Sequence, residues 1–260
     1  MKIAVITGAS SGMGREFVLR LAKEKPFDEI WVIARRLERL QSLQTLVPEV
    51  KIRPLAMDLT REDSLAEYKT LLATENPEVS VLVNASGFGK FGAFEDIELS
   101  EQLNMIDLND KAYVAMTYLT LPYMRAGGEI YQLDSLSSFQ PVPYITVYGA
   151  TKAFVLSFSR ALNVELKKRE IRCMAVCPGW VRTEFFDRAV RDDTITYYNR
   201  FFTPGQVVAR ALRDMKKGKD VSVCGASIRG LVGDELAANK GCKGAQTDEQ
   251  RFIKGGIFTQ

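Results

Sequence analysis

Short apolar runs alternate with longer segments of helical periodicity along most of the chain. The predicted strands are Ile3–Thr7, Glu29–Ala34, Lys51–Met57, Val79–Asn84, Glu129–Asp134, Arg172–Val176 and Asp220–Cys224. Several are apolar on both faces, which is typical of strands covered by helices above and below a sheet. The predicted helices are Gly14–Lys23, Leu37–Leu46, Arg61–Glu75, Ser100–Met124, Thr151–Arg169 and Pro204–Lys217. This alternation predicts one α/β domain with a doubly wound, mainly parallel sheet.

Two segments depart from the alternation. Residues 180–203 are rich in aromatic and charged side chains without a clean period, which is typical of a binding loop or lid. At the end of this segment, Thr203 is a good N-cap and Pro204 fits the first turn of a helix. Residues 233–260 hold many Gly, Lys, Gln and Asp residues and few apolar ones. We therefore expect one domain over residues 1–232, including the lid, followed by a loosely ordered tail over residues 233–260.

The composition removes several classes of chemistry. The 260 residues contain no histidine, which excludes His-dependent nucleophilic catalysis and His-ligated zinc, and no metal site is predicted. A net charge of +3, from 35 basic and 32 acidic residues, does not favour nucleic acid or an anionic membrane as a partner. We find no apolar segment long enough to span a membrane and no signal-peptide pattern at the start. We expect a cytoplasmic protein in which Cys173 and Cys177 are small buried side chains.

The first predicted strand runs directly into a glycine-rich loop, Thr7-Gly8-Ala9-Ser10-Ser11-Gly12-Met13-Gly14. Glycines at this spacing allow a tight turn and a close backbone approach, and the following helix presents free N–H groups and a partial positive charge. A purely structural turn is the alternative. The position between the first strand and the first helix instead favours a pyrophosphate site of the Rossmann type. The predicted cofactor contacts in the loop are Gly8, Ser10, Ser11, Gly12, Met13 and Gly14.

The second predicted strand ends in Arg35-Arg36, where folds that bind NAD place an acidic residue for the ribose hydroxyls. Two guanidinium groups match a 2′-phosphate in charge and in hydrogen-bonding geometry. The alternative is a solvated helix start that continues through Arg39. The pair favours NADP(H) over NAD(H) as cofactor.

Further candidates for cofactor binding follow the third and fourth predicted strands. Asp58 can accept a hydrogen bond from an adenine amino group. The run from Asn84 to Gly87 is expected to line the crevice outside the strand ends. A turn-forming role is the alternative for both sites.

The fifth predicted strand leads to Ser135, and Tyr148 and Lys152 lie four residues apart near the start of a long helix, on one face. A free phenol has a pKa near 10. An ammonium about 5 Å away, at an effective dielectric of about 20, favours the phenolate by roughly 3 kcal/mol. We therefore expect the pKa of Tyr148 to fall toward neutrality, where acid–base exchange is most efficient. Ser135 can hold a carbonyl oxygen against the phenol while a nicotinamide supplies the hydride.

Together these motifs resemble the short-chain dehydrogenase/reductase family, in its compact single-domain branch. The resemblance runs from about Lys2 to Cys224 and rests on TGASSGMG, Asp58-Leu59, NASG, Asn109, Ser135, YGATK and CPGWVRT. It implies a catalytic tetrad of Asn109, Ser135, Tyr148 and Lys152, in which Asn109 bends the fourth helix and holds a water that relays protons through Lys152. The implied cofactor contacts also include Leu59, Asn84, Ala85, Ser86, Tyr148, Lys152, Pro178, Gly179, Val181 and Thr183. The resemblance further implies a homodimer or homotetramer that pairs through the fourth and fifth helices.

The chain departs from the family pattern at one motif. Asn84-Ala85-Ser86-Gly87 stands where the family usually has Asn-Asn-Ala-Gly, so the polar contact from the second position is lost. This departure bears on local hydrogen bonding more than on activity.

The substrate is expected to be a small apolar carbonyl compound or alcohol. The basis is an aromatic cluster in the lid, with Trp180, Phe185, Phe186, Tyr197, Tyr198, Phe201 and Phe202, and with Phe88 and Phe91 after the fourth strand. Burial in the core is the alternative role for each of these rings. Two rival functions remain open, which are reduction of a carrier-bound 3-oxoacyl thioester and non-catalytic regulation by bound NADP.

Overall fold

The computed structural model describes residues 1–190 and 200–224, which are built around one seven-stranded sheet. The strands lie in the order β3 (Lys51–Ala56), β2 (Glu29–Ala34), β1 (Lys2–Thr7), β4 (Glu78–Asn84), β5 (Met124–Leu133), β6 (Arg172–Cys177) and β9 (Val221–Val223). Every neighbouring pair is parallel. The predicted doubly wound α/β fold is therefore confirmed, and each predicted strand corresponds to one strand of this sheet.

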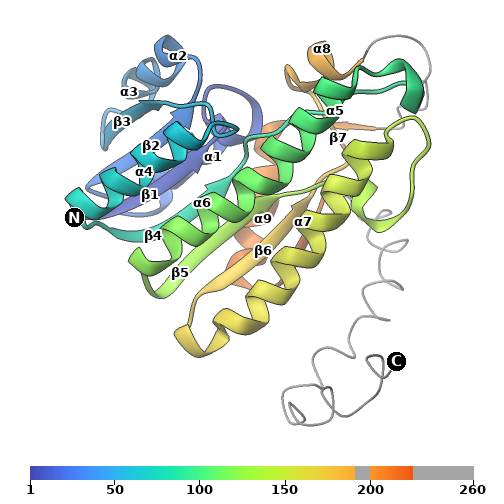
Figure 1. Cartoon of the computed structure of the whole chain (residues 1–260). Coiled ribbons are helices and arrows are strands. Elements are labelled where there is room, and N and C mark those ends of the chain that lie inside the picture. The colour runs from blue at the N-terminus through green and yellow to red at the C-terminus, as the bar shows by residue number, and fades with distance from the viewer. Residues whose placement is uncertain (191–199, 225–260) are drawn as a thin grey trace, which may run out of the picture. The chain divides into compact units, whose positions relative to one another are not determined.

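Helices cover both faces of the sheet (Figure 1). One face carries α4 (Glu62–Glu75), α5 (Leu99–Ile106), α6 (Ala112–Thr120) and α7 (Thr146–Glu165). The other carries α1 (Gly12–Glu24) and α9 (Pro204–Lys216), while α2 (Leu37–Gln41) and α3 (Leu43–Leu46) lie beside β3. Because both faces are covered, the strands other than the edge strand β3 are buried along most of their length, as their apolar runs predict.

The core between the sheet and α4 and α6 fixes the strands in register. Trp31 and Ile130 of the sheet are fully buried in one cluster with Tyr68 of α4 and Met116 of α6. Burial of each large side chain contributes about 1.5–3 kcal/mol. In this layer the Tyr68 hydroxyl lies 2.7 Å from Thr120 Oγ1. The carboxyl ends of the strands are therefore held as one rigid edge.

Two predicted helices are interrupted. The segment predicted as one helix over Ser100–Met124 consists of α5, a π-helical turn over Asp107–Lys111, α6 and a 3₁₀ turn over Leu121–Tyr123, and Met124 already belongs to β5. The segment predicted as Leu37–Leu46 is divided at Ser42, whose hydroxyl donates to the Arg39 carbonyl oxygen at 2.8 Å. Such local side-chain bonds compete with the helical ladder.

The predicted lid contains short regular elements. Among the described residues, β7 (Trp180–Val181) pairs with β8 (Phe201–Phe202), and α8 (Phe185–Ala189) lies between them in sequence. The predicted cap at its end is confirmed, because Thr203 and Gln206 form a reciprocal capping box and Pro204 opens α9. Residues 191–199 of the lid and the predicted tail over 233–260 lie outside the described residues.

Candidate active site

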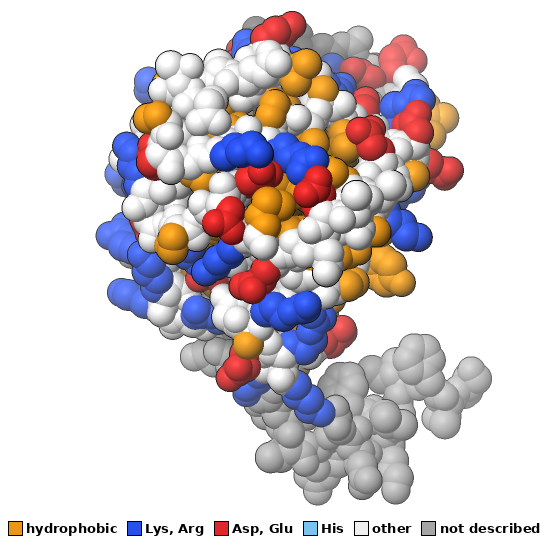
Figure 2. Space-filling view, turned by 90° about the vertical axis from the view of Figure 1, so that its left-hand side faces the viewer, with side chains coloured by type: hydrophobic (Ala, Val, Ile, Leu, Met, Phe, Trp, Pro, Cys, Tyr) orange, Lys and Arg blue, Asp and Glu red, His pale blue; other side chains and the backbone are white. Residues whose placement is uncertain are grey.

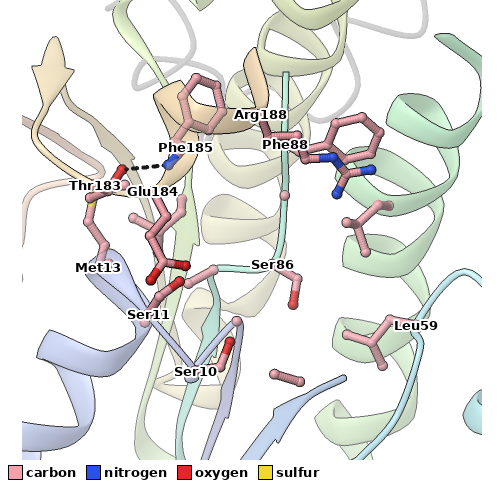
Figure 3. Close-up of a pocket in the computed structure, with 18 of the residues that line it drawn as sticks. Ser10, Ser11, Met13, Leu59, Ser86, Phe88, Thr183, Glu184, Phe185 and Arg188 are labelled. Atoms are coloured by element: carbon pink, nitrogen blue, oxygen red, sulfur yellow. Dashed lines mark hydrogen bonds between the residues drawn. The ribbon is translucent and has the colours of Figure 1, made fainter. Parts of the chain in front are cut away.

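A cleft of about 700 Å³ opens at the carboxyl ends of the strands. It lies over the boundary between β1 and β4, where the order of the strands reverses, which is where ligands bind in open α/β sheets. Its predicted lining residues are Gly8, Ser10, Ser11, Gly12, Met13, Gly14, Arg35, Arg36, Asp58, Leu59, Ala85, Ser86, Tyr148, Lys152 and Thr183. Figure 3 shows the glycine loop on one side and Phe88 and Arg188 on the other.

The glycine loop brings backbone atoms closer than side chains would permit. Gly8 has φ +65°, and a Cβ there would lie 2.5 Å from the Ala85 carbonyl oxygen. A Cβ at Gly14 would lie 2.4 Å from the Gly8 carbonyl oxygen. The Ser11 side chain makes no capping bond at the start of α1, so it leaves the first-turn N–H groups to other acceptors. This arrangement fits a bound pyrophosphate.

The two arginines after β2 have different surroundings. Arg35 lines the cleft, whereas Arg36 donates to Glu184 Oε2 at 2.9 Å and lies 3.2 Å from the hydroxyls of both Ser10 and Ser11. Glu184 also accepts from Arg39. Charges of both signs are interspersed over the face shown in Figure 2. The predicted 2′-phosphate ligand Arg36 is therefore already bound to a carboxylate of the lid.

Asp58 and Asn84 make internal hydrogen bonds. Asp58 lines the cleft, and its Oδ1 accepts from the backbone N–H and the hydroxyl of Thr60, so the turn-forming role is present. The side chain of Asn84 does not line the cleft as predicted. It is buried away from the cleft and donates to Thr117 Oγ1 and Gln132 Oε1. The strand alternation turns its side chain toward α6, so any contact of Asn84 with a ligand in the cleft has to come from the backbone.

Tyr148 lies at the inner end of the cleft, against the lid. Its ring is 5.5 Å from that of Phe185, and a Cβ at Gly89 would lie 2.9 Å from both rings. Burial raises the pKa of the Tyr148 phenol well above its ordinary value, and a side-chain hydrogen bond with Ser135 opposes this shift without overcoming it. The expectation that Lys152 lowers this pKa toward neutrality is wrong for this structure, because removal of the phenol from water is the largest effect.

The Lys152 ammonium is buried beneath Tyr148. Its Nζ donates to the Leu133 carbonyl oxygen at 2.8 Å and lies 5.7 Å from the centre of the Tyr148 ring. Burial lowers the pKa of Lys152, while Asp134 and Asp110 raise it. The two side chains that the four-residue spacing places on one face of α7 are thus brought together in the cleft.

Asn109 lies in the π-helical turn behind the cleft, where the resemblance implies a bend. Its Oδ1 accepts from Phe88 N at 3.1 Å, and its Nδ2 donates to Phe88 O at 2.9 Å and to Thr151 Oγ1 at 3.1 Å. These bonds tie the loop after β4 to α7. Ser135 caps a short 3₁₀ turn by accepting from Ser137 N, beside Tyr148.

Sequence reasoning missed the acidic groups around Lys152. Asp134 directly follows β5, is buried, and accepts from Cys177 Sγ at 3.2 Å, while its Oδ1 has no hydrogen-bond partner. Burial raises the pKa of Asp134 to about 7, and Lys152 opposes this shift. Asp110 in the π-helical turn has a pKa raised to about 7 for the same reason. The position of Asp134 next to Ser135 at a strand end is the signal that could have identified it.

Three residues from the predicted CPGWVRT contacts do not line the cleft. Pro178 accepts a backbone bond from Leu136, Val181 is buried in β7, and Gly179 lies between them. Their backbone positions Thr183, which does line the cleft and accepts from Phe185 N at 3.3 Å (Figure 3). Phe185 of the predicted aromatic cluster also lines the cleft, and the missed lining residues of the lid are Glu184, Asp187, Arg188 and Val190.

Within residues 1–190 and 200–224, no helix is both long and apolar enough to cross a membrane. The same residues contain no cluster of three or more Cys, Asp or Glu side chains suited to a metal ion.

Comparison with known proteins identifies the family. The model of the short chain dehydrogenase family matches residues 2–194, and the chain therefore belongs to that family. A short-chain dehydrogenase from Sphingobium yanoikuyae, solved with NADPH, has a TM-score of 0.82 and 28% identity over 96% of this chain and 98% of that one.

Two further proteins differ in the substrates that their names state. A bulky-bulky ketone specific alcohol dehydrogenase from Comamonas testosteroni has a TM-score of 0.77 and 26% identity over 96% of both chains. The very-long-chain 3-oxoacyl-CoA reductase of Bos taurus is 33% identical over 190 residues, which are 70% of this chain and 60% of that protein.

Proposed function

We propose that this chain binds NADP(H) in the cleft and reduces the carbonyl group of a small apolar substrate, or catalyses the reverse oxidation. The observation that carries the proposal is the partly buried Tyr148 phenol at the inner end of the cleft, with Ser135 beside it and Lys152 beneath it. NADPH is the cofactor of the similar Sphingobium structure, and the glycine loop and Arg35 and Arg36 offer groups for its phosphates. Bound there, it would supply the hydride.

The chain's own residues supply the proton and the orientation. Reduction adds hydride to the carbonyl carbon and a proton to its oxygen, so the acid must be protonated when it acts. The raised pKa of Tyr148 keeps the phenol protonated at neutral pH. Ser135 shares a hydrogen bond with Tyr148 and can orient the substrate oxygen toward it. Lys152 provides the nearby positive charge that stabilises the phenolate left after transfer.

Aromatic side chains support an apolar substrate. Phe91, Trp180, Phe185 and Phe186 form one cluster with Tyr148. Ring centroids of neighbouring pairs lie 5.5–6.4 Å apart. A substrate that reaches Tyr148 must therefore contact carbon-rich surfaces. The similar enzyme of Comamonas testosteroni is named for bulky-bulky ketones.

The test compares Tyr148→Phe with Tyr144→Phe in NADPH-dependent reduction of a panel of apolar ketones and aldehydes. We expect Tyr148→Phe to lower kcat by about a thousandfold, since it removes the proton donor, while NADPH binding is unchanged. Tyr144 is exposed, lies four residues before Tyr148, and serves as the control for loss of a phenol. Full activity of Tyr148→Phe would contradict the mechanism, and NADPH binding without turnover of any substrate would favour the regulator.

A second candidate is reduction of a 3-oxoacyl thioester. It is favoured by the 33% identity to a very-long-chain 3-oxoacyl-CoA reductase. Adding 3-oxoacyl-CoA compounds of increasing chain length to the substrate panel separates the two candidates, because a thioester reductase prefers them over simple ketones.

We also propose that the chain forms a homodimer or homotetramer through α5, α6 and α7. Several apolar side chains on these helices are exposed to solvent: Leu99, Leu103, Ile106, Val114, Tyr118, Phe154 and Val164. Single exposed apolar residues are ordinary, but a group on adjacent helices is typical of an interface. Light scattering of the purified chain measures the assembly.

A further inference from the structure

Glu184 occupies the hydrogen-bonding groups of Arg36 that face the cleft. One carboxylate oxygen accepts from Arg36 Nη1 at 2.9 Å, and the other accepts from Arg39. The second terminal nitrogen of Arg36 contacts the hydroxyls of Ser10 and Ser11, both at 3.2 Å. The guanidinium is therefore bonded on both of its terminal nitrogens, and its one ionic partner among the described residues comes from the lid.

A carboxylate and a phosphate are alternative partners for the same guanidinium. Both are oxyanions that accept parallel N–H bonds, so they compete for one set of donors. Arg36 and Glu184 have side chains that are each 43% exposed. Exposed ion pairs contribute little stability and exchange readily. The Arg39 and Arg36 guanidinium groups hold the pKa of Glu184 below its ordinary value, so Glu184 is charged at neutral pH.

The displaced carboxylate would keep a positively charged environment. A second pocket of about 730 Å³ lies on the other side of Glu184 and shares Ser10, Ser11, Gly12, Thr183 and Glu184 with the cleft. Its lining also includes Arg15, Arg39 and Arg182. Glu184 can therefore leave Arg36 and remain paired with Arg39.

We propose that Glu184 is a specificity-determining residue that competes with the 2′-phosphate of NADP(H) for Arg36 and so weakens NADP(H) binding relative to NAD(H). NAD(H) has a hydroxyl in place of the phosphate and leaves the Arg36–Glu184 pair intact. This inference rests on the proposed binding of NADP(H) in the cleft.

The experiment measures the Kd of NADPH and NADH for the full chain and for Glu184→Gln. Glutamine keeps the shape and the hydrogen-bond acceptor but removes the charge. We expect NADPH to bind about fivefold more tightly to the variant, the upper range for an exposed ion pair, while NADH binding is unchanged. Adenosine 2′,5′-bisphosphate, which lacks the nicotinamide, is expected to gain the same factor because the effect lies at the phosphate.

Glu38→Gln is the matched control. Glu38 lies on α2 between Arg36 and Arg39 in sequence, and neither arginine pairs with it in the described structure. This variant removes the same charge from the same neighbourhood and is expected to leave the ratio of the two dissociation constants unchanged. An equal gain with Glu38→Gln would show a general electrostatic effect and overturn the proposal.

Two further outcomes overturn the proposal. Weaker binding of both nucleotides to Glu184→Gln would mean that the ion pair holds the lid over either cofactor. Unchanged binding of NADPH would mean that the phosphate does not use Arg36. Failure of the proposed function itself has a different signature, because the wild-type chain would then bind neither nucleotide.

Discussion

The two ends of the cleft both contain ionisable side chains, but these are exposed to water at one end and shielded from it at the other. At one end, Arg36 and Glu184 are exposed charges bonded to one another. At the other end, Tyr148, Lys152 and Asp134 are removed from water, and burial is the largest cause of each pKa shift. At the exposed end, the hydrogen-bonded arginines lower the pKa of Glu184. In the interior, desolvation outweighs the neighbouring charge.

The largest predicted effect comes from a substitution in the glycine loop, at the exposed end of the cleft. Gly14→Ala is expected to lower the free energy of unfolding by about 3 kcal/mol or more and to abolish nucleotide binding, because the new Cβ overlaps a backbone carbonyl that cannot rotate away. Gly149→Ala is the control, since a Cβ there meets nothing closer than 3.9 Å. Denaturant unfolding measures both, and equal stability of the two variants would show that the loop is not tightly packed.

The next effect concerns the buried end and depends on pH. The pKa of Asp134 is raised to about 7, so the folded state keeps a proton that the unfolded state loses above about pH 4. The wild-type protein therefore loses stability as the pH rises from about 4 to 7. Asp134→Asn cannot ionise and is expected to gain about 2 kcal/mol over the wild type between pH 5 and pH 8.

Denaturant unfolding at the two pH values measures this gain. A constant difference between Asp134→Asn and the wild type across that range would show that Asp134 does not change its protonation there.

The smallest effect contrasts the two ends directly. Raising the salt concentration from about 0.05 M to about 0.5 M shortens the Debye length and weakens exposed charge pairs, but it affects buried ones much less. We expect the KM for NADPH to rise about threefold, while kcat is unchanged. Steady-state kinetics at fixed carbonyl concentration provide the measurement. A fall in kcat of the same size would show that salt reaches the Tyr148 end.

Local patterns in the sequence predicted what depends on a few neighbouring residues. The glycine loop, the pairing of Tyr148 with Lys152 and the N-cap at Thr203 each follow from short spacings, and the structure contains all three. Membership of the short-chain dehydrogenase family, expected from the ordered motifs, is also confirmed.

Contacts between distant parts of the chain were not predictable in the same way. Arg36 and Glu184 are 148 positions apart, so no local pattern signals their ion pair. The direction in which the Tyr148 pKa shifts was missed because the packing of Phe185 on its ring is a tertiary contact. The side chain of Asn84 was assigned to the cleft because a motif gives position along the chain but not the side of the strand on which the side chain lies.

The π-helical turn at Asp107–Lys111 determines the direction in which each side chain of the following helix α6 points. Each residue advances an α-helix by about 100°, so deleting one residue of α6 between this turn and Thr117 would rotate Thr117 about the helix axis by that angle. Thr117 would then leave Asn84 and Gln132, with which it shares hydrogen bonds beneath the sheet edge. A single-residue deletion after this turn would thus leave a core whose polar groups no longer face one another, whereas the π-helical turn itself can lose its extra residue without that rotation.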